Sequence, residues 1–516
     1  MEVLPYTAPE LKQLLSGKYT PLRVISKKRH VAHLLKLFSP EYLDAKTMVV
    51  EESYINRDYL IDYQQYYSRC FEDYPKACKR IHFFNTEFAR ERLVDLLLRP
   101  EKTIKDELQK YYLGFIVIKP IPTRIIGYTL LENPLTNAEN SINFWGTKNY
   151  RIHFFGVELK IHSLAFQEQD KVVAACATTA IWISLNKAAD KGRVIVKSPS
   201  EITIDAAQSS PDGSRLFPNK GLSIQQICNG FLKSGMVSEV KKADLPFKIG
   251  DKQINVVTHQ YFKKILFAYA PIGIPILIVI ENPDSNGILH AVAAFGYQED
   301  TSIVLQDIPF KVASDRIIRV ICHDDQWGPY TDIDFSVNNK FGLTNEWTRL
   351  TPGRDSYIRS LVVPLYSKIR ISYEDVEVLI KGVNAILRYF FRLNSIPDIP
   401  EWSIQVVLSE KYKQDIRSSK LSDEEKIKIL TSYLPKYLWI AKCYLTGYQI
   451  LEFSFDATNV ANGNFCLNIS CFETGLMHLL KETLQNNVET FTEFFHVQTG
   501  QAFYEYLLHS LEVEVE

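Results

Sequence analysis

The chain has 516 residues, too many for one compact core, and a usual domain size of roughly 100–200 residues predicts about three domains. Hydrophobic residues make up 46% of the sequence and charged residues 23%, which excludes a disordered or fibrous protein. The net charge is -1, so no overall field attracts nucleic acid or an anionic membrane, and neither is expected as a partner.

The sequence shows no targeting or membrane segment. Residues 1–21 have neither a basic segment nor a sustained apolar stretch, so we expect no secretory signal. The uncharged run 265–280 contains Pro271 and Pro275 and is too short to span a membrane. Eight cysteines are few for this length, and free thiols are expected in a reducing compartment. These features predict a cytoplasmic protein.

Residues 1–150 mix helix and strand signals. The apolar runs at 80–85 and 113–118 predict buried strands. The basic stretch 23–36 could meet phosphates, but a solvent-facing helix surface is the preferred interpretation. We expect an N-terminal α+β accessory domain here.

Residues 151–345 place helices before strands, which is typical of an α+β domain. A strand or hairpin is expected near 152–166, and a long helix begins near Cys176. Further helices are predicted at 223–232 and 259–268, followed by strands at 274–281, 290–297 and 316–323. The chemically suggestive residues lie in this domain.

Residues 346–516 contain well-marked helix boundaries. Ser372 with Asp375, and Ser422 with Glu425, form capping boxes. A hairpin is expected from strands at 436–444 and 448–456, and the segment 473–513 is amphipathic and helical. We expect a C-terminal, helix-rich α+β accessory domain.

A nucleophilic cysteine is indicated at Cys176. Small residues surround it, and an apolar helical stretch follows, so the thiol is expected in the first turn of a buried helix. Unpaired N–H groups and the positive end of the helix dipole stabilise a thiolate there. Placed in the middle of a helix, the same thiol would be a small buried hydrophobe.

A histidine and an acid complete the pattern. His290 opens the apolar strand H-A-V-A-A-F-G-Y, where an imidazole is costly to bury without partners on both ring nitrogens. The strand at 316–323 runs directly into Asp324 and Asp325, either of which could orient the imidazole. Asp307 is a third candidate for that role. The structural alternatives are that His290 is a buried histidine with all its hydrogen bonds made, and that the acids after the strand only cap a turn.

The motifs C-A-T-T-A-x-W at Cys176 and H-A-V-x-x-x-G-Y at His290 resemble those of papain-like cysteine peptidases, and of bacterial C39-like peptidases in particular. The resemblance covers residues 167–330. It implies a papain-like domain at 151–345, flanked by the two accessory domains, with Cys176 as nucleophile and His290 as general base and acid. It implies that Asp324 orients the histidine.

The resemblance also implies an oxyanion donor, for which Gln169 is the first candidate and Gln167 the second. Many relatives have glycine directly after the cysteine and before the histidine, where this chain has Ala177 and Leu289. These residues narrow the cleft and leave the substrate class open.

The implied function is hydrolysis of amide bonds in a peptide or protein substrate, with a regulatory protein partner bound by the flanking domains. The alternatives are a non-catalytic interaction scaffold, and a thiol acyltransferase or deamidase effector. No cofactor is expected. Metal binding is not expected either, because Cys70, Cys78 and His82, and the pair Cys466 and Cys471, lack a fourth ligand at zinc-site spacing.

Overall fold

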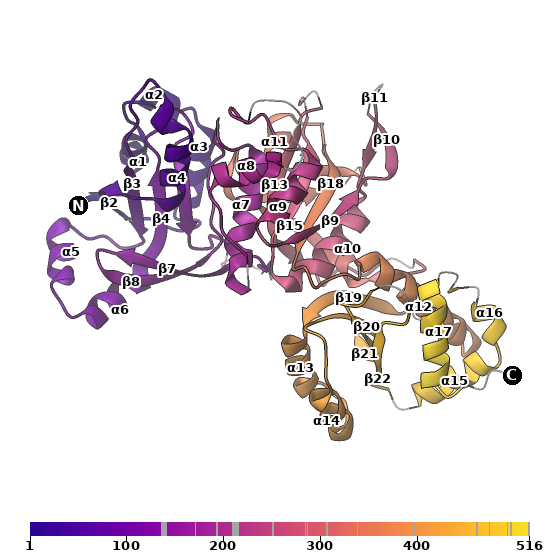
Figure 1. Ribbon diagram of the computed structural model, residues 1–516. Helices are drawn as coiled ribbons and strands as arrows, with labels where there is room; N and C mark the ends of the chain where they lie inside the picture. Colours follow the sequence, from indigo (N-terminus) through magenta and orange to yellow (C-terminus); the bar gives the residue numbers. More distant parts are fainter. Residues whose placement is uncertain are drawn as a thin grey trace. The chain divides into compact units, whose positions relative to one another are not determined.

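The computed structural model describes the chain apart from a set of short segments (Figure 1). These are residues 136–141, 171, 192–193, 209–215, 250–251, 284, 286, 306–307, 338, 397–398, 461–462, 474, 493, 496–497 and 514–516. The described residues form a mixture of helices and strands, which is consistent with the predicted α+β class.

The chain divides into two units. The first holds residues 1–258, 273–299 and 318–365, and the second holds residues 259–272, 300–317 and 366–516. The boundary predicted near residue 150 lies inside the first unit. Two segments assigned from the sequence to the middle domain, 259–272 and 300–317, belong to the second unit. The three-domain division stays a prediction.

The first unit begins with an antiparallel sheet whose strands follow one another in chain order. They are β1 (Glu2–Pro5), β2 (Thr47–Tyr54), β3 (Cys78–Phe84), β4 (Tyr112–Ile118) and β5 (Ile126–Leu131). The helices of this region are α1 (Ala8–Leu15), α2 (Leu22–Ile25), α3 (Arg29–Leu37), α4 (Arg57–Gln65), α5 (Arg90–Leu97) and α6 (Glu101–Tyr111). Buried strands at 80–85 and 113–118 were predicted, and β3 and β4 lie there with nearly all their side chains buried.

The basic stretch 23–36 forms α2 and α3. Arg23, Lys27, Arg29 and Lys36 are exposed, as expected for a solvent-facing surface, whereas the opposite face of α3 buries Val31 and Leu34 in the core of this sheet. The apolar residues recur at helical spacing, so one face of α3 must be covered. His30 and His33 are buried with that face.

A second sheet of the first unit closes on itself. Its strand order is β12-β13-β15-β16-β17-β18-β9, and β12 also pairs with β18, so the strands from β12 to β18 form a ring. Their bounds are β9 (Val237–Lys242), β12 (Ile276–Glu281), β13 (Leu289–Glu299), β15 (Ile317–Asp324), β16 (Gly328–Phe335), β17 (Gly342–Thr344) and β18 (Ser356–Leu365). Strand β6 (Ile142–Asn143) pairs with β13. The strands predicted at 274–281, 290–297 and 316–323 correspond to β12, β13 and β15.

Helices cover this closed sheet. They are α7 (Cys176–Ala188), α8 (Pro199–Gln208), α9 (Ile224–Lys233) and α11 (Glu346–Leu350). Helix α7 packs against β13 and against α8 and α9, which Figure 1 shows side by side. Almost every residue of α7 is buried, and the Trp182 indole N–H donates to Asp58 at 2.8 Å. Two hairpins extend from the unit, β7 (Lys148–Phe154) with β8 (Val157–Ser163) and β10 (Leu245–Ile249) with β11 (Lys252–Val256).

The second unit has its own sheet, ordered β14-β19-β20-β21-β22. The strands are β14 (Lys311–Val312), β19 (Glu401–Leu408), β20 (Tyr437–Leu445), β21 (Tyr448–Asp456) and β22 (Cys466–Cys471). The helices are α10 (His259–Tyr269), α12 (Tyr373–Leu393), α13 (Ser409–Ser418), α14 (Asp423–Thr431), α15 (Leu476–Gln485), α16 (Val488–Thr492) and α17 (Gln498–Ser510). The predicted capping boxes at Ser372 and Ser422 are confirmed, as is the β20–β21 hairpin. Among the described helices, none is both long and apolar enough to cross a membrane.

Candidate active site

Cys176 is the first residue of α7 and is half-buried. The turn before it is held by Asp170, whose Oδ1 accepts hydrogen bonds from the N–H groups of Val172 at 2.7 Å and Val173 at 3.3 Å. Thr203 of α8 donates to the Val173 carbonyl at 2.7 Å. The N-cap residue, Ala175, offers no capping side chain, so the positive end of the helix is directed at the region of the thiol.

His290 is the second residue of β13 and is buried. Its Nε2 lies 2.9 Å from Oδ1 of Asp324, at the end of β15. Because a carboxylate only accepts, Nε2 carries the hydrogen of this bond. The Cys176 side chain interacts with the same imidazole and contributes to raising its pKa. Cys176, His290 and Asp324 are therefore brought together from a helix and two strands.

The electrostatic surroundings favour a charged imidazole. Burial alone lowers the pKa of His290, but the charge and hydrogen bond of Asp324, with an interaction of the Cys176 side chain, raise it well above its ordinary value. Burial raises the pKa of Asp324, but the charge of His290 and the donors around the carboxylate hold it below its ordinary value. A positive imidazole next to a thiol is the arrangement that favours a thiolate.

Asp324 accepts three hydrogen bonds. Its Oδ1 receives the His290 ring N–H and, at 2.8 Å, the backbone N–H of Gln326. Its Oδ2 receives the indole N–H of Trp347 at 3.3 Å. A carboxylate held by several donors stays ionised and keeps the imidazole in one orientation.

Asp325, the neighbouring acid, has different surroundings. Its Oδ1 lies 3.9 Å from Nε2 of His290, and its buried Oδ2 has no hydrogen-bond partner among the described residues. Burial raises the pKa of Asp325 to about 7. Asp324 is thus the carboxylate that contacts the imidazole. Asp307, the third candidate from the sequence, lies outside the described residues.

Replacing Asp325 with Asn is expected to change how stability depends on pH. The folded protein holds a proton on Asp325 up to about pH 7, whereas an unfolded carboxyl loses it near 3.8. The wild type should therefore lose stability relative to Asp325→Asn as the pH rises between these two values. Urea unfolding of both proteins at several pH values measures the difference. A difference that does not change with pH would mean that Asp325 is ionised in the fold.

Gln326 was given no role in the sequence analysis. Its Nε2 lies 3.2 Å from Nδ1 of His290, the ring nitrogen that does not face Asp324. No local periodicity marks this residue, because it lies in the loop between β15 and β16. The only sequence signal is its position directly after the two acids.

The two glutamines that were candidates for the oxyanion donor differ from each other in burial. Gln169 is half-buried, and no hydrogen bond joins it to another described residue. Gln167 is buried, and its Nε2 has no hydrogen-bond partner in the described part of the chain. Neither contacts His290 by a hydrogen bond, so the oxyanion role of Gln169 stays a prediction.

Two tryptophans and an arginine shield the pair formed by His290 and Asp324. The Trp347 ring lies 6.2 Å from the His290 ring, and the Trp327 ring lies 5.6 Å from Trp347, both edge-on. The guanidinium of Arg29 lies 5.0 Å from the Trp327 ring and 4.6 Å from the Trp347 ring. Exclusion of water by these rings strengthens the hydrogen bond between His290 and Asp324.

Helix α3 holds the loop that carries the acids. The His30 ring N–H donates to the Asp325 carbonyl at 2.7 Å, and the His33 ring N–H donates to the Pro329 carbonyl at 2.6 Å. Gly328 has a φ of +154°, and a Cβ there would lie 2.4 Å from the His33 ring. The N-terminal region therefore contributes directly to the geometry of the site.

His290, Asp324 and Asp325 also form a group of potential metal ligands. One ligand atom from each lies within 4.8 Å of the others, in a search of the described residues. In this structure Nε2 of His290 is engaged by Asp324, which fits an imidazole oriented by a carboxylate. We assign no metal to this group.

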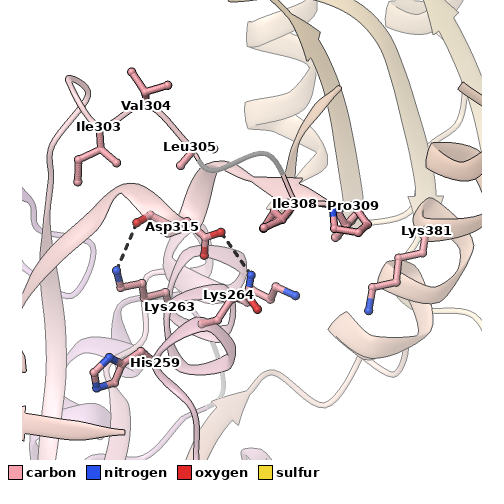
Figure 2. Close-up of a pocket in the computed structure, with 12 residues that line it drawn as sticks. His259, Lys263, Lys264, Ile303, Val304, Leu305, Ile308, Pro309, Asp315 and Lys381 are labelled. Carbon is pink, nitrogen blue, oxygen red and sulfur yellow. Dashed lines mark hydrogen bonds between the residues drawn. The ribbon is translucent and has the colours of Figure 1, made fainter. Parts of the chain in front are cut away.

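A cavity of about 740 Å³ lies within the second unit (Figure 2). Lys263, Lys264 and Lys381 line it together with apolar residues such as Val304. The ammonium groups of Lys264 and Lys381 both bind Glu377, and Lys263 donates to the Asp315 carbonyl at 3.3 Å. The cavity contains no cysteine, and its lysines are already engaged. We therefore keep the group around Cys176 as the candidate active site.

Comparisons with protein-family models and with curated proteins found no match for this chain. Its function is inferred from the geometry of the site.

Proposed function

We propose that the chain is a papain-like cysteine peptidase that hydrolyses amide bonds in a peptide or protein substrate. The observation that carries the proposal is the imidazole of His290, which donates a hydrogen bond to Asp324 and also interacts with the Cys176 side chain. A cysteine, a base and an orienting acid in contact are the parts that nucleophilic catalysis at a carbonyl needs.

In this mechanism the Cys176 thiolate attacks the carbonyl carbon of the scissile amide. The negative charge that develops on the carbonyl oxygen is stabilised by the Cys176 backbone N–H, at the start of α7, and by a glutamine amide, for which Gln169 is the first candidate. His290 then donates its proton to the leaving amine. Water, activated by His290, cleaves the thioester and restores the thiol.

The surroundings of the cysteines support this assignment. Each of the eight cysteines is a free thiol in the described part of the chain, which suits a reducing compartment such as the cytoplasm. Burial raises the thiol pKa of each of the other cysteines, namely Cys70, Cys78, Cys228, Cys322, Cys443, Cys466 and Cys471. Cys176 alone among the eight has the charged imidazole as partner.

Alkylation by iodoacetamide at about pH 6 is therefore expected to label Cys176 first. Mass spectrometry of peptides taken at short times would give the rate at each cysteine. His290→Ala is the matched variant, and it should lose the rate advantage of Cys176 because the imidazolium is gone. Equal labelling of several cysteines in the wild type would contradict an activated thiolate and favour a non-catalytic scaffold.

A further inference from the structure

A second, smaller cavity adjoins the candidate active site. Its volume is about 280 Å³, and it lies within the first unit. Its lining includes the cationic side chains of Lys28, Arg29 and Arg124, and it is completed by Val24, His30, Thr123 and Gln326. No carboxylate is among the residues that line it. This is the part of the basic stretch 23–36 that faces the site.

The guanidinium of Arg29 is positioned so that it can bind an anion. Its guanidinium lies against the rings of both Trp327 and Trp347, and the residue is exposed. No carboxylate pairs with it among the described residues. The two ring centroids are only 5.6 Å apart, so the rings do not enclose both faces of the guanidinium, and its N–H edge can point away from them. That edge matches the two oxygen atoms of a carboxylate or phosphate.

Lys28 and Arg124 leave an excess of positive charge in the cavity. Both bind the same buried carboxylate, Glu168, at 2.5 Å and 3.2 Å. His30 also lies nearby, but burial lowers its pKa, so it adds no charge at neutral pH. With Arg29, the cavity therefore has three cationic side chains, and Glu168 is the carboxylate that binds two of them.

Gln326 connects this cavity with the catalytic pair. It lines the cavity, and its amide lies 3.2 Å from Nδ1 of His290. A group bound in the cavity would be separated from the imidazole by one side chain.

We propose that this cavity binds an anionic oxygen group, a carboxylate or a phosphate, of the substrate whose amide bond Cys176 attacks. The proposal rests on the proposed function, because it assigns the cavity to the substrate of the same thiol. It narrows the substrate to one with such a group close to the cleaved bond.

Two alkylating reagents of similar size test the proposal without a known substrate. Iodoacetate carries a carboxylate and iodoacetamide does not. In both reactions the Cys176 sulfur forms a bond to the methylene carbon, and iodide leaves with the electron pair. We expect Arg29→Gln and Arg124→Gln each to lower the ratio of the iodoacetate rate to the iodoacetamide rate at Cys176 by about fivefold, since each removes a charge near the bound carboxylate.

Arg23→Gln is the matched control, because Arg23 is an exposed arginine of α2 that does not line the cavity. It should leave the ratio unchanged. The iodoacetamide rate at Cys176 reports separately on the catalytic pair. If Cys176 is labelled selectively in the wild type but the ratio is the same in all variants, the cavity proposal is overturned while the proposed function stands. If iodoacetamide shows no selectivity for Cys176, both fail.

The same assay distinguishes a carboxylate from a phosphate as the anionic group that the cavity binds. Acetate or inorganic phosphate is added at constant ionic strength, and the rate of iodoacetate labelling is measured in the wild type. Stronger protection by acetate indicates a substrate carboxylate, and stronger protection by phosphate indicates a phosphate. Protection by neither would overturn the proposal.

Discussion

Replacing Asp324 with Asn is expected to lower peptide hydrolysis by on the order of 10³–10⁴-fold, the scale seen when the acid that orients a catalytic histidine becomes an amide. The amide NH₂ or oxygen would face Nε2 of His290, so the imidazole would lose its single orientation and its charged partner. The pKa of His290 should fall towards its ordinary value because the carboxylate that raises it is gone. Turnover of a mixed peptide library measures the first effect.

The pH dependence of Cys176 alkylation distinguishes an orienting role from simple damage to the fold. In the wild type the raised pKa of His290 keeps the imidazole charged through neutral pH, beside the Cys176 thiol. In Asp324→Asn the imidazole of His290 should lose its charge at a lower pH than in the wild type. Labelling of Cys176 near pH 6 should therefore be slower in the variant. Asp325→Asn is the matched control, since its carboxylate is 3.9 Å from the same nitrogen. Equal losses of turnover in the two variants would contradict the assignment of Asp324.

Local patterns were sufficient to find the elements that carry the site. A run of apolar residues after Cys176 predicts a helix, and an alternation-free apolar run after His290 predicts a buried strand. The structure has α7 beginning at Cys176 and β13 containing His290 as its second residue. The acid is found in the same way, because Asp324 ends β15. Each of these features is encoded within about ten neighbouring residues.

Contacts between distant segments could not be predicted in this way. Arg29 and Trp347 come from regions far apart in the sequence, and only the fold brings them together beside His290. The burial of His30 and His33 was missed because the charges of this stretch suggest a solvated helix, whereas α3 packs one face against the loop after β15. Gln326 was missed because a loop residue has no periodic signal.

The division of the chain was also beyond local patterns. The segments 259–272 and 300–317 interrupt the middle region in the sequence but belong to the second unit. Helix α10 lies in one of them and contacts β19 of that unit. The assignment of such segments to a unit depends on contacts between residues far apart in the sequence, which composition and local spacing do not reveal.

Glu168 is expected to be the most important carboxylate for the stability of the first unit. Its side chain is fully buried, and it binds Lys28 at 2.5 Å and Arg124 at 3.2 Å. Its second oxygen accepts the backbone N–H of Ile126 at 3.3 Å. Burial raises the pKa of Glu168, but the charge and hydrogen bond of Lys28 and the charge of Arg124 hold it below its ordinary value. The carboxylate is therefore ionised in the fold and connects α3 to the segment before Cys176.

Glu168→Gln keeps the shape of the side chain but leaves Lys28 partly buried without a counter-charge. A loss of about 3–5 kcal/mol in the free energy of unfolding is expected, since breaking a buried pair leaves one charge uncompensated. Because the pKa of Glu168 is lowered in the fold, its contribution is present above the ordinary carboxyl pKa and disappears as the pH falls through the lowered value. The difference between variant and wild type should therefore shrink in acid.

The matched control is Glu72→Gln, which breaks the exposed ion pair with Lys18 at 2.6 Å. That change should leave the free energy of unfolding almost unchanged, because solvent screens an exposed pair. Urea unfolding of the three proteins at neutral and acidic pH gives the comparison. If Glu168→Gln were no more destabilising than Glu72→Gln, Lys28 and Arg124 would be adequately solvated without Glu168. In that case the cations beside Gln326 would not depend on this carboxylate for their position.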